Sequence, residues 1–381
     1  MARRPPSRFR RGFTLAEITV GIAIASIILL GVSGATILTT KAMESEFDIR
    51  RPTDDVRIGV AYLERVTRLA GYGVDPRVAF DFSVAGLPGT TKDNYVGGDF
   101  VTDDLAFRYR DPAFLRRGSL DETGATLTLD DDETLGVALP EGQALILICP
   151  GAEDFYAARL SADAAASATS ANLVAYGSPF SAAVPGCLKE GTGAQAAYVT
   201  LLHDIRLRVM PLGGVPYLVA LYGFGDPANT RYAPVARNVN DFQVAYEMNR
   251  PPPTLSADAP DKTSGNGNWI LGDDAEDPLP SPAAEAPAYD TDYASTARFT
   301  AHPANIRGLR ISISVFGDHN PEAARRSSFF AAENSTAAAK PNRFNLTVGT
   351  SVRLPNMASR TFFVPPLQQP GTNDDSNRWG G

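Results

Sequence analysis

The chain has 381 residues, 44% of them hydrophobic, which is enough to bury one large core or two smaller ones and excludes a disordered chain. Its formal net charge is −8, and the chain after residue 12 is more acidic still, at −13, because five arginines precede that point. Such a body lacks the clustered cations that drive binding to nucleic acid, so we expect no nucleic-acid partner for it. The 33 glycines and 29 prolines favour short strands joined by turns over a helical bundle.

A basic cluster opens the chain, and a long apolar run follows it. Five arginines lie between residues 3 and 11, whereas residues 13–40 carry one charged side chain, Glu17. As a helix rising about 1.5 Å per residue, this run exceeds the roughly 30 Å hydrocarbon thickness and predicts one transmembrane helix. By the positive-inside rule, the arginines keep the N-terminus in the cytoplasm and place everything after Lys41 outside.

The glycine between these two segments marks a candidate cleavage site. A secretory signal peptide is cut after its apolar stretch, whereas a cut after Gly12 removes the arginines and keeps the helix. The segment Arg10–Glu17, RRGFTLAE, therefore resembles type IV prepilins and the pseudopilins of type II secretion. The resemblance implies that prepilin peptidase cleaves between Gly12 and Phe13 and methylates Phe13. The alternative is an ordinary membrane anchor with the same residues.

Glu17 is the candidate assembly residue. An ionised carboxylate in apolar surroundings is costly unless it has a partner, so an acid inside a membrane helix indicates a function. The prepilin resemblance implies that its partner is the N-terminal amine of a neighbouring subunit, which is the amine of Phe13 in this chain.

A helical pattern continues beyond the membrane through residues 41–70. Pro52 predicts a kink or break near Arg51, and Gly71 and Gly73 predict the end of the helix. One side of the pattern is apolar and is expected to pack on a globular head. Its members are Val56, Val60, Leu63, Val66 or Thr67, and Ala70.

The rest of the chain predicts strands. Compact or alternating apolar patterns cover residues 105–110, 125–130, 144–149, 205–209, 309–315, and 344–354 with a bulge at Gly349. Residues 157–171 fit no element. The predicted fold class is α+β, with a long N-terminal helix packed on an antiparallel sheet, as in pilins.

The expected domain organisation has five parts. They are a leader (1–12), a transmembrane helix (13–40), the periplasmic half of the same helix (41–73), a β-rich head (74–364) and a tail (365–381). Within the head, residues 250–290 are dominated by Pro, Ala, Asp, Gly and Ser and predict a long exposed loop.

The two cysteines, Cys149 and Cys187, allow one intramolecular pairing. If this region faces an oxidising space, as the predicted topology places it, a disulfide is expected. The alternative is a pair of reduced, buried thiols.

Several segments behind the leader resemble the PilW-type minor pilins, in the order found in that family. The chain departs from the family at Pro52 and in the proline-rich stretch 250–290. The segments that carry the resemblance are residues 63–73, 149–155, 239–246, 305–311 and 344–348.

No catalytic or metal site emerges from the spacing of reactive residues. His203, His302 and His319 are far apart, and the acidic runs 130–133 and 272–277 lack calcium-loop spacing and are interpreted as solvated turns. Nucleotide-binding and nucleophile motifs are missing from the sequence. We therefore expect no enzyme activity, no cofactor and no metal.

The resemblance implies a minor pilin of a type IV pilus that primes assembly or forms part of the filament tip. The alternatives are a pseudopilin of a type II secretion system and a tip-associated adhesin that uses the 250–290 loop. The implied partners are prepilin peptidase, other minor pilins and the major pilin, the inner-membrane assembly platform, and membrane lipid before assembly. The implied location is the inner membrane, then the periplasm and the extracellular pilus.

Overall fold

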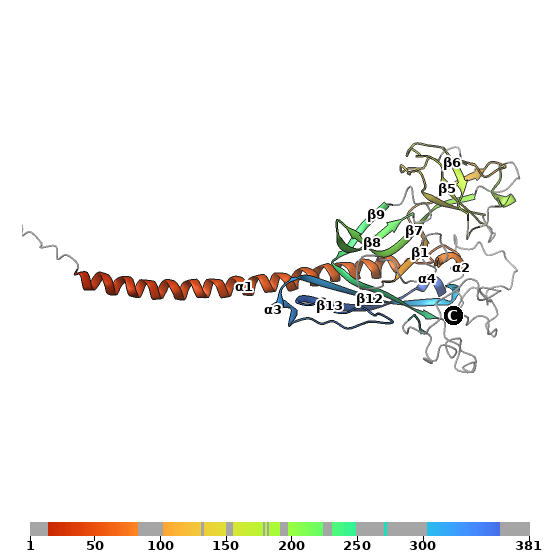
Figure 1. Ribbon diagram of the computed structural model, residues 1–381. Helices are drawn as coiled ribbons and strands as arrows, with labels where there is room; N and C mark the ends of the chain where they lie inside the picture. The colour runs from red at the N-terminus through yellow and green to blue at the C-terminus, as the bar shows by residue number, and fades with distance from the viewer. Residues whose placement is uncertain are drawn as a thin grey trace, which may run out of the picture.

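The structure, a computed structural model of the full chain, shows a long helix that projects from a β-rich head (Figure 1). This arrangement confirms the predicted fold class. Gly12, Phe13, His302, the tail and most of the 250–290 loop lie outside the described residues. The described residues are 14–82, 102–130, 133–149, 155–177, 180, 183–190, 197–223, 231–248, 270–272 and 303–358.

Helix α1 spans Leu15–Thr67, 53 residues and roughly 80 Å at 1.5 Å per residue. Residues 15–44 are exposed throughout, whereas residues on one side of α1 are buried from Ser45 onward. The predicted apolar side packs on the head: Val56, Leu63 and Val66 are buried and belong to the main core. The helix is thus a projecting rod for half its length and a core element for the other half.

Pro52 does not break α1, so a break near Arg51 was a wrong prediction. A proline cannot donate to the carbonyl four residues earlier, which here belongs to Asp48. Strand β12 (Ile306–His319) packs closely against this turn, because a Cβ added to its Gly317 would lie 2.9 Å from the Asp48 carbonyl oxygen and 3.5 Å from the Pro52 ring. Tertiary packing therefore supports the helix where its own hydrogen bonding is interrupted.

One side of α1 rests on a four-stranded antiparallel sheet with the order β11-β10-β12-β13. Its strands are β10 (Val239–Met248), β11 (Ile270–Leu271), β12 (Ile306–His319) and β13 (Arg343–Arg353). The alternation predicted for residues 309–315 holds, because Leu309, Ile311 and Ile313 enter the main core. Gly349 pairs in register with Ser312, so the predicted bulge there is wrong.

A second sheet covers another side of α1 with β1 (Asp104–Arg110), β7 (Ala197–Leu212), β8 (Val215–Tyr222) and β9 (Arg231–Arg237). A Cβ added to Gly59 would lie 3.2 Å from Ala236 of β9 and 3.9 Å from Ile313 of β12. The helix is therefore enclosed between the two sheets, as Figure 1 shows, and all three elements share one core.

The strands between β1 and β7 form a closed barrel that the sequence analysis did not predict. They are β2 (Arg116–Leu120), β3 (Thr126–Leu129), β4 (Ala144–Ile148), β5 (Phe155–Leu160) and β6 (Ser170–Ala175). Antiparallel pairing runs in the order β2-β3-β6-β5-β4-β7, and β7 pairs back to β2, which closes the circle. A separate apolar cluster that includes Leu120, Leu145 and Val199 fills its interior. Closure removes the exposed strand edges that promote aggregation.

Short helical turns complete the described parts of the head. They are α2 (Pro76–Ala79), the 3₁₀ turns Gly186–Leu188 and Pro303–Asn305, α3 (Pro321–Ala324) and α4 (Pro355–Ala358). Helix α1 ends at Thr67, and Gly71 and Gly73 follow with φ of 76° and 64°. This left-handed backbone is the conformation that favours glycine, so these residues turn the chain after the helix as predicted.

The close approach of β12 to α1 predicts that Gly317→Ala lowers the free energy of unfolding by about 1–3 kcal/mol, because the new methyl group meets a backbone oxygen. Gly349→Ala is the matched control in the same sheet, since its Cβ would meet the Ser312 hydroxyl at 3.2 Å, which can rotate away. Thermal unfolding of the detergent-solubilised full chain measures both. Equal melting temperatures for the two variants would contradict the packing argument.

Candidate functional site

The first turn of α1 is closed by a capping box between Thr14 and Glu17. The Thr14 backbone N–H and hydroxyl donate to Glu17 Oε2 at 2.9 and 3.0 Å, and the Glu17 N–H donates to Thr14 Oγ1 at 3.3 Å. A capping box satisfies backbone donors that the first turn leaves unpaired. Glu17 thus has a local structural role that the sequence analysis missed, although the Thr-x-x-Glu spacing before an apolar run is a known signal for it.

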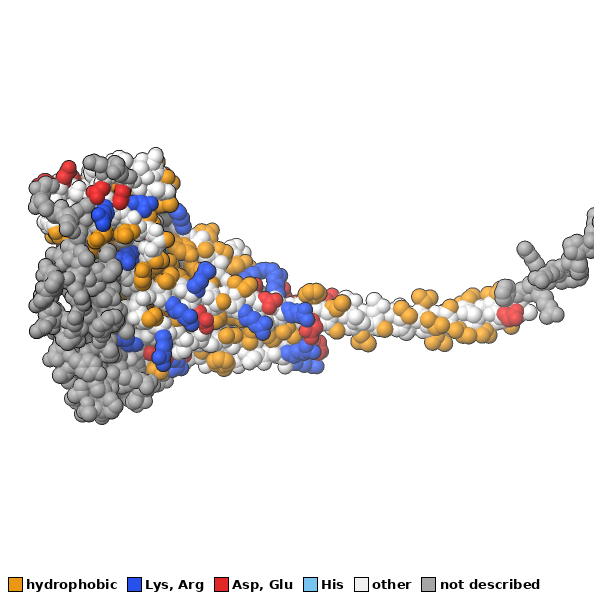
Figure 2. Space-filling view, turned by 180° about the vertical axis from the view of Figure 1, so that it is seen from behind, with side chains coloured by type: hydrophobic (Ala, Val, Ile, Leu, Met, Phe, Trp, Pro, Cys, Tyr) orange, Lys and Arg blue, Asp and Glu red, His pale blue; other side chains and the backbone are white. Residues whose placement is uncertain are grey.

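The projecting part of α1 presents an apolar surface all round. This helix is long and apolar enough to cross a membrane, and none of its most apolar stretch is buried. Figure 2 shows hydrophobic side chains along the rod and charged side chains gathered where it enters the head. Its exposed large side chains include Leu15, Ile18, Val20, Ile22, Ile24, Ile27, Ile28, Leu29, Leu30, Val32, Ile37 and Leu38.

A helix that is apolar on every side is stable only when something covers it. Each fully exposed Leu or Ile side chain forgoes about 1.5–3 kcal/mol of burial energy in water. Membrane lipid or the helices of other subunits can supply the cover. Among residues 15–40 the one acid is Glu17, which lies in the first turn, at the end of the rod farthest from the head.

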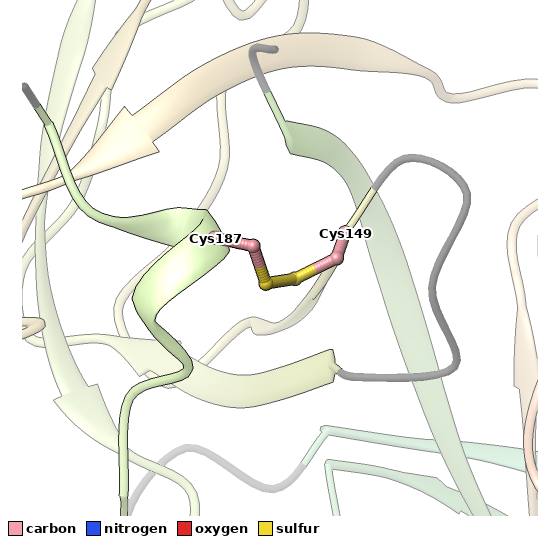
Figure 3. The surroundings of a disulfide bond; sticks show 2 residues. All are labelled: Cys149 and Cys187. Carbon is pink, nitrogen blue, oxygen red and sulfur yellow. A yellow bond between two sulfur atoms is a disulfide. The ribbon is translucent and has the colours of Figure 1, made fainter. Parts of the chain in front are cut away.

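A disulfide joins Cys149 and Cys187 with a Cα–Cα distance of 5.9 Å, so the predicted pairing is present (Figure 3). Cys149 directly follows β4, and Cys187 lies in the 3₁₀ turn Gly186–Leu188. Leu188, next to the bond, is buried in the barrel core. The bond therefore fastens this turn to the barrel and closes a loop with a sequence separation of 38.

A buried ion cluster anchors the barrel to the rest of the head. Arg108 on β1 is fully buried, and its Nε donates to Asp204 of β7 at 2.9 Å. The same guanidinium group pairs with Asp81 and donates to the Val78 carbonyl at 3.0 Å. Tyr176, which follows barrel strand β6, donates its hydroxyl to Asp204 at 2.9 Å. One cation thus connects four segments that are distant in sequence.

Burial alone would lower the pKa of Arg108, but Tyr176, Asp204 and Asp81 outweigh it and hold that pKa above its usual range. The guanidinium group therefore remains charged inside the head. Sequence reasoning missed this cluster because its members lie 27 and 96 residues apart, and no local pattern connects them.

The described residues contain no group of three or more His, Cys, Asp or Glu side chains placed to bind a metal. His203 instead pairs with Asp111 at 3.1 Å, and His319 ends β12. Asp130 lies in a turn, where its carbonyl oxygen accepts from the Glu133 N–H at 2.8 Å. These histidines and this part of the acidic run therefore have local structural contacts.

The disulfide predicts a loss of stability in the double variant Cys149→Ser/Cys187→Ser. Its free energy of unfolding should fall by about 2–4 kcal/mol, because the unfolded chain regains the freedom of the open loop. Thermal unfolding with and without reductant tests this. Reductant should lower the melting temperature of the wild type and leave that of the double variant unchanged, and insensitivity of the wild type would contradict the prediction.

The ion cluster predicts that Arg108→Met destabilises the head by about 3–5 kcal/mol, because it leaves two carboxylates in the interior without their cation. Tyr176→Phe is the control and should cost about 1–2 kcal/mol, because its hydroxyl accepts from Arg108 Nε at 3.3 Å and donates to Asp204 at 2.9 Å. Thermal unfolding and protease resistance of the barrel report both changes. An Arg108→Met variant no less stable than Tyr176→Phe would show that the cation does not anchor the barrel.

Residues 7–33 match the prokaryotic N-terminal methylation motif, which spans the proposed cleavage site and the start of the apolar helix. No curated protein matches the chain. Among solved structures, a type IV-like pilin from Thermus thermophilus is similar at 13% sequence identity, covering 58% of this chain and 87% of that chain, with a TM-score of 0.19.

The methylation motif and the observed architecture of this chain are consistent with each other, without reference to the Thermus structure. The motif falls on the projecting apolar helix, and this helix continues into an antiparallel β head. Together they show a prokaryotic N-terminal methylation motif on a helix that is long and apolar enough to cross a membrane, joined to an antiparallel β head.

Proposed function

We propose that the chain is a minor pilin of a type IV pilus. Prepilin peptidase cleaves after Gly12 and methylates Phe13, and the remaining helix packs into the filament. The observation that carries the proposal is the division of α1 into a rod exposed over residues 15–44 and a half enclosed by the head. A subunit of this shape can exchange lipid for neighbouring helices without refolding its head.

Glu17 supports a filament over a simple anchor. A simple anchor can use Glu17 as a helix cap, whereas an assembling helix can in addition use the same acid to select a neighbour. The N-terminal amine created at Phe13 lies four residues before Glu17 in the sequence. Two copies of the helix in slight axial stagger can therefore pair the amine of one with the carboxylate of the other.

The path of the protein follows from this assignment. Before assembly it is a single-pass inner-membrane protein with leader 1–12 in the cytoplasm, residues 13–40 in lipid, and residues 41–381 in the periplasm. Its partners are prepilin peptidase, the inner-membrane assembly platform, other minor pilins and the major pilin. After assembly it belongs to the extracellular pilus. The disulfide in the barrel supports an oxidising location for the head.

The low-copy role, in priming assembly or at the filament tip, rests on the PilW-type resemblance of the head segments. A type II pseudopilin is the alternative within filament proteins. Deletion of the gene separates the two: loss of surface pili and twitching motility supports the pilus, whereas a block in the export of secreted enzymes with normal piliation would support the secretion system.

The proposal predicts that Glu17→Ala is still cleaved and inserted in the membrane but is depleted from sheared filaments by about tenfold or more. The physical reason is the loss of the carboxylate that pairs with a neighbour's amine in an apolar environment. Immunoblots of membrane and sheared-pilus fractions measure the distribution.

Thr14→Ala is the matched control, because it removes the two hydrogen bonds of the Thr14 hydroxyl and keeps both the acid and the Thr14 backbone N–H. If Glu17 acted only through this cap, Thr14→Ala would be depleted from filaments as well. Incorporation of Glu17→Ala at the wild-type level would refute the assembly role.

A further inference from the structure

Strand β13 ends the four-stranded sheet, and its outer edge is covered over part of its length. The Thr347 N–H donates to the Ser328 carbonyl at 2.9 Å, and the Ser328 N–H donates to the Asn345 carbonyl at 2.9 Å. The covering segment goes no further along the edge. The Phe330 N–H donates to Thr347 Oγ1 at 3.3 Å, and this hydroxyl donates to the Phe330 carbonyl at 3.0 Å. A side chain thus takes the place of the next backbone bonds, and the covering ends there.

The rest of the same edge is uncovered. Every second residue of an antiparallel strand directs both of its backbone groups away from the partner strand. Asn345 and Thr347 point away from β12, so Gly349, Ser351 and Arg353 do as well. These three residues are exposed, and their outward backbone groups have no hydrogen-bond partner among the described residues. Residues 349–353 contain no proline and no register shift, which are common ways to protect an exposed edge.

A hollow of about 450 Å³ opens beside the uncovered edge. Its lining includes Gly349 and Ser312 from the sheet, and Phe330 and Glu333 from the segment that leaves β13. Gly349 keeps the hollow open, since even a Cβ there would lie 3.2 Å from Ser312 Oγ. Phe330 is 52% exposed and presents an apolar surface to it. When a peptide adds to a sheet edge, backbone hydrogen bonds give affinity and pockets for alternate side chains give specificity. The edge and the hollow together supply both.

Helix α1 flanks the uncovered edge on the other face of the sheet. Thr350 Oγ1 donates to Glu64 Oε1 at 2.5 Å, and Asn356 Nδ2 donates to the Arg68 carbonyl at 2.8 Å. The end of β13 therefore runs alongside the last turns of α1. Arg68 lies one turn after Glu64 on the same side of the helix, and it is exposed.

The charges around the edge favour an acidic occupant. Arg68 and Arg353 are exposed and take part in none of the salt bridges among the described residues. Two acids contact this stretch, Glu64 and Glu247, and both already accept hydrogen bonds from its hydroxyl groups. The exposed acid Asp54 precedes Glu64 by ten residues, about 15 Å along the helix. The two arginines are thus available to acidic side chains of a partner.

We propose that the uncovered edge of β13, residues 349–353, binds an extended acidic segment of a different protein of the filament. The segment adds to the sheet as a fifth strand, places an apolar side chain in the hollow beside Phe330, and pairs acidic side chains with Arg68 and Arg353. The inference rests on the proposed function, because the filament is what brings the partner to the head. One copy of this chain is enough for the contact, in keeping with a low-copy subunit.

A synthetic peptide tests the site on the detergent-solubilised full chain. The probe has a valine-threonine-valine centre with two aspartates at each end, so it reads the same in both strand directions and carries acids on both faces. The control peptide has lysines in place of the aspartates. Fluorescence anisotropy should show saturable binding of the acidic probe, with a dissociation constant below about 1 mM and about tenfold or more tighter than that of the control. Bound probe should also slow hydrogen exchange in the segment 345–354, because outward N–H groups become paired.

Ser351→Pro tests the backbone pairing, because it removes an outward N–H and leaves the bonds between β13 and β12 in place. It should weaken binding of the acidic probe by about tenfold or more, since one hydrogen bond is lost and the ring blocks the edge. Ser351→Ala is the matched control, because it keeps the N–H, and it should change the affinity by less than about twofold. Thermal unfolding checks that both variants are folded.

Charge reversal tests the choice of occupant with variants whose changes are exposed. Arg68→Glu/Arg353→Glu should reverse the preference, so that the lysine peptide binds more tightly than the acidic probe. Arg325→Glu, an exposed arginine after α3, is the matched control and should leave the preference unchanged.

A photo-crosslinking amino acid in place of Ser351 identifies the occupant in sheared filaments. The crosslink should join this chain to a different protein, and mass spectrometry should place it in an acidic segment of that protein. A crosslink to residues 359–381 of the same chain, to a second copy of this chain or to a basic segment would overturn the proposed partner, as would the absence of any crosslink.

The outcomes separate this site from the proposed function. No saturable binding of the acidic probe, or binding that neither Ser351→Pro nor charge reversal changes, overturns the site even if Glu17→Ala is excluded from filaments as expected. Normal incorporation of Glu17→Ala overturns the filament role instead. The binding and exchange measurements use the solubilised chain, so they decide on the edge whether or not filaments form.

Discussion

The structure depends on one constraint, which is that a single helix must be stable in two different surroundings. Residues 15–40 expose apolar side chains on every side and need an apolar surrounding, whereas from residue 45 onward one side of α1 is buried in the head. The head provides that second environment with two sheets, and Gly59 is small enough for Ala236 and Ile313 to approach the helix from different directions. Because the core is built on α1 itself, a pull or twist on the rod reaches the head directly.

The barrel is connected to this core in a different way. Strand β7 is long enough to serve both, with residues 197–201 in the barrel and the rest beside β1 and β8. The ion cluster around Arg108 lies at this junction, where an apolar contact alone would allow rotation. A buried cation that needs Asp81, Asp204 and Tyr176 together has few alternative geometries, so the cluster favours one orientation of the barrel.

The parts predicted from the sequence are those with local periodicity. The apolar run, the packed side of α1 and the alternation of Leu309, Ile311 and Ile313 each follow from neighbours in the chain. The barrel could not be predicted, because its closure depends on pairing between β2 and β7, about 80 residues apart, which no local pattern encodes.

Two local interpretations of the sequence also differ from the structure. The stretch 157–171, which fitted no element, overlaps β5 (155–160) at its start and β6 (170–175) at its end. Gly349 was misread because a strand glycine often marks a bulge, whereas here it accommodates Ser312 at close range.

The capping box changes how the Glu17 carboxylate is understood. Sequence reasoning treats it as an acid that needs an external partner, yet Thr14 already donates two hydrogen bonds to it. Both bonds use Oε2, and a carboxylate has lone pairs for about four bonds on two oxygens. Capping and pairing with a neighbour's amine are therefore compatible. The cap orients the carboxylate before assembly, so a neighbouring amine meets a positioned acceptor and less side-chain entropy is lost when the pair forms. Cleavage after Gly12 would leave Thr14 in the chain and this arrangement intact.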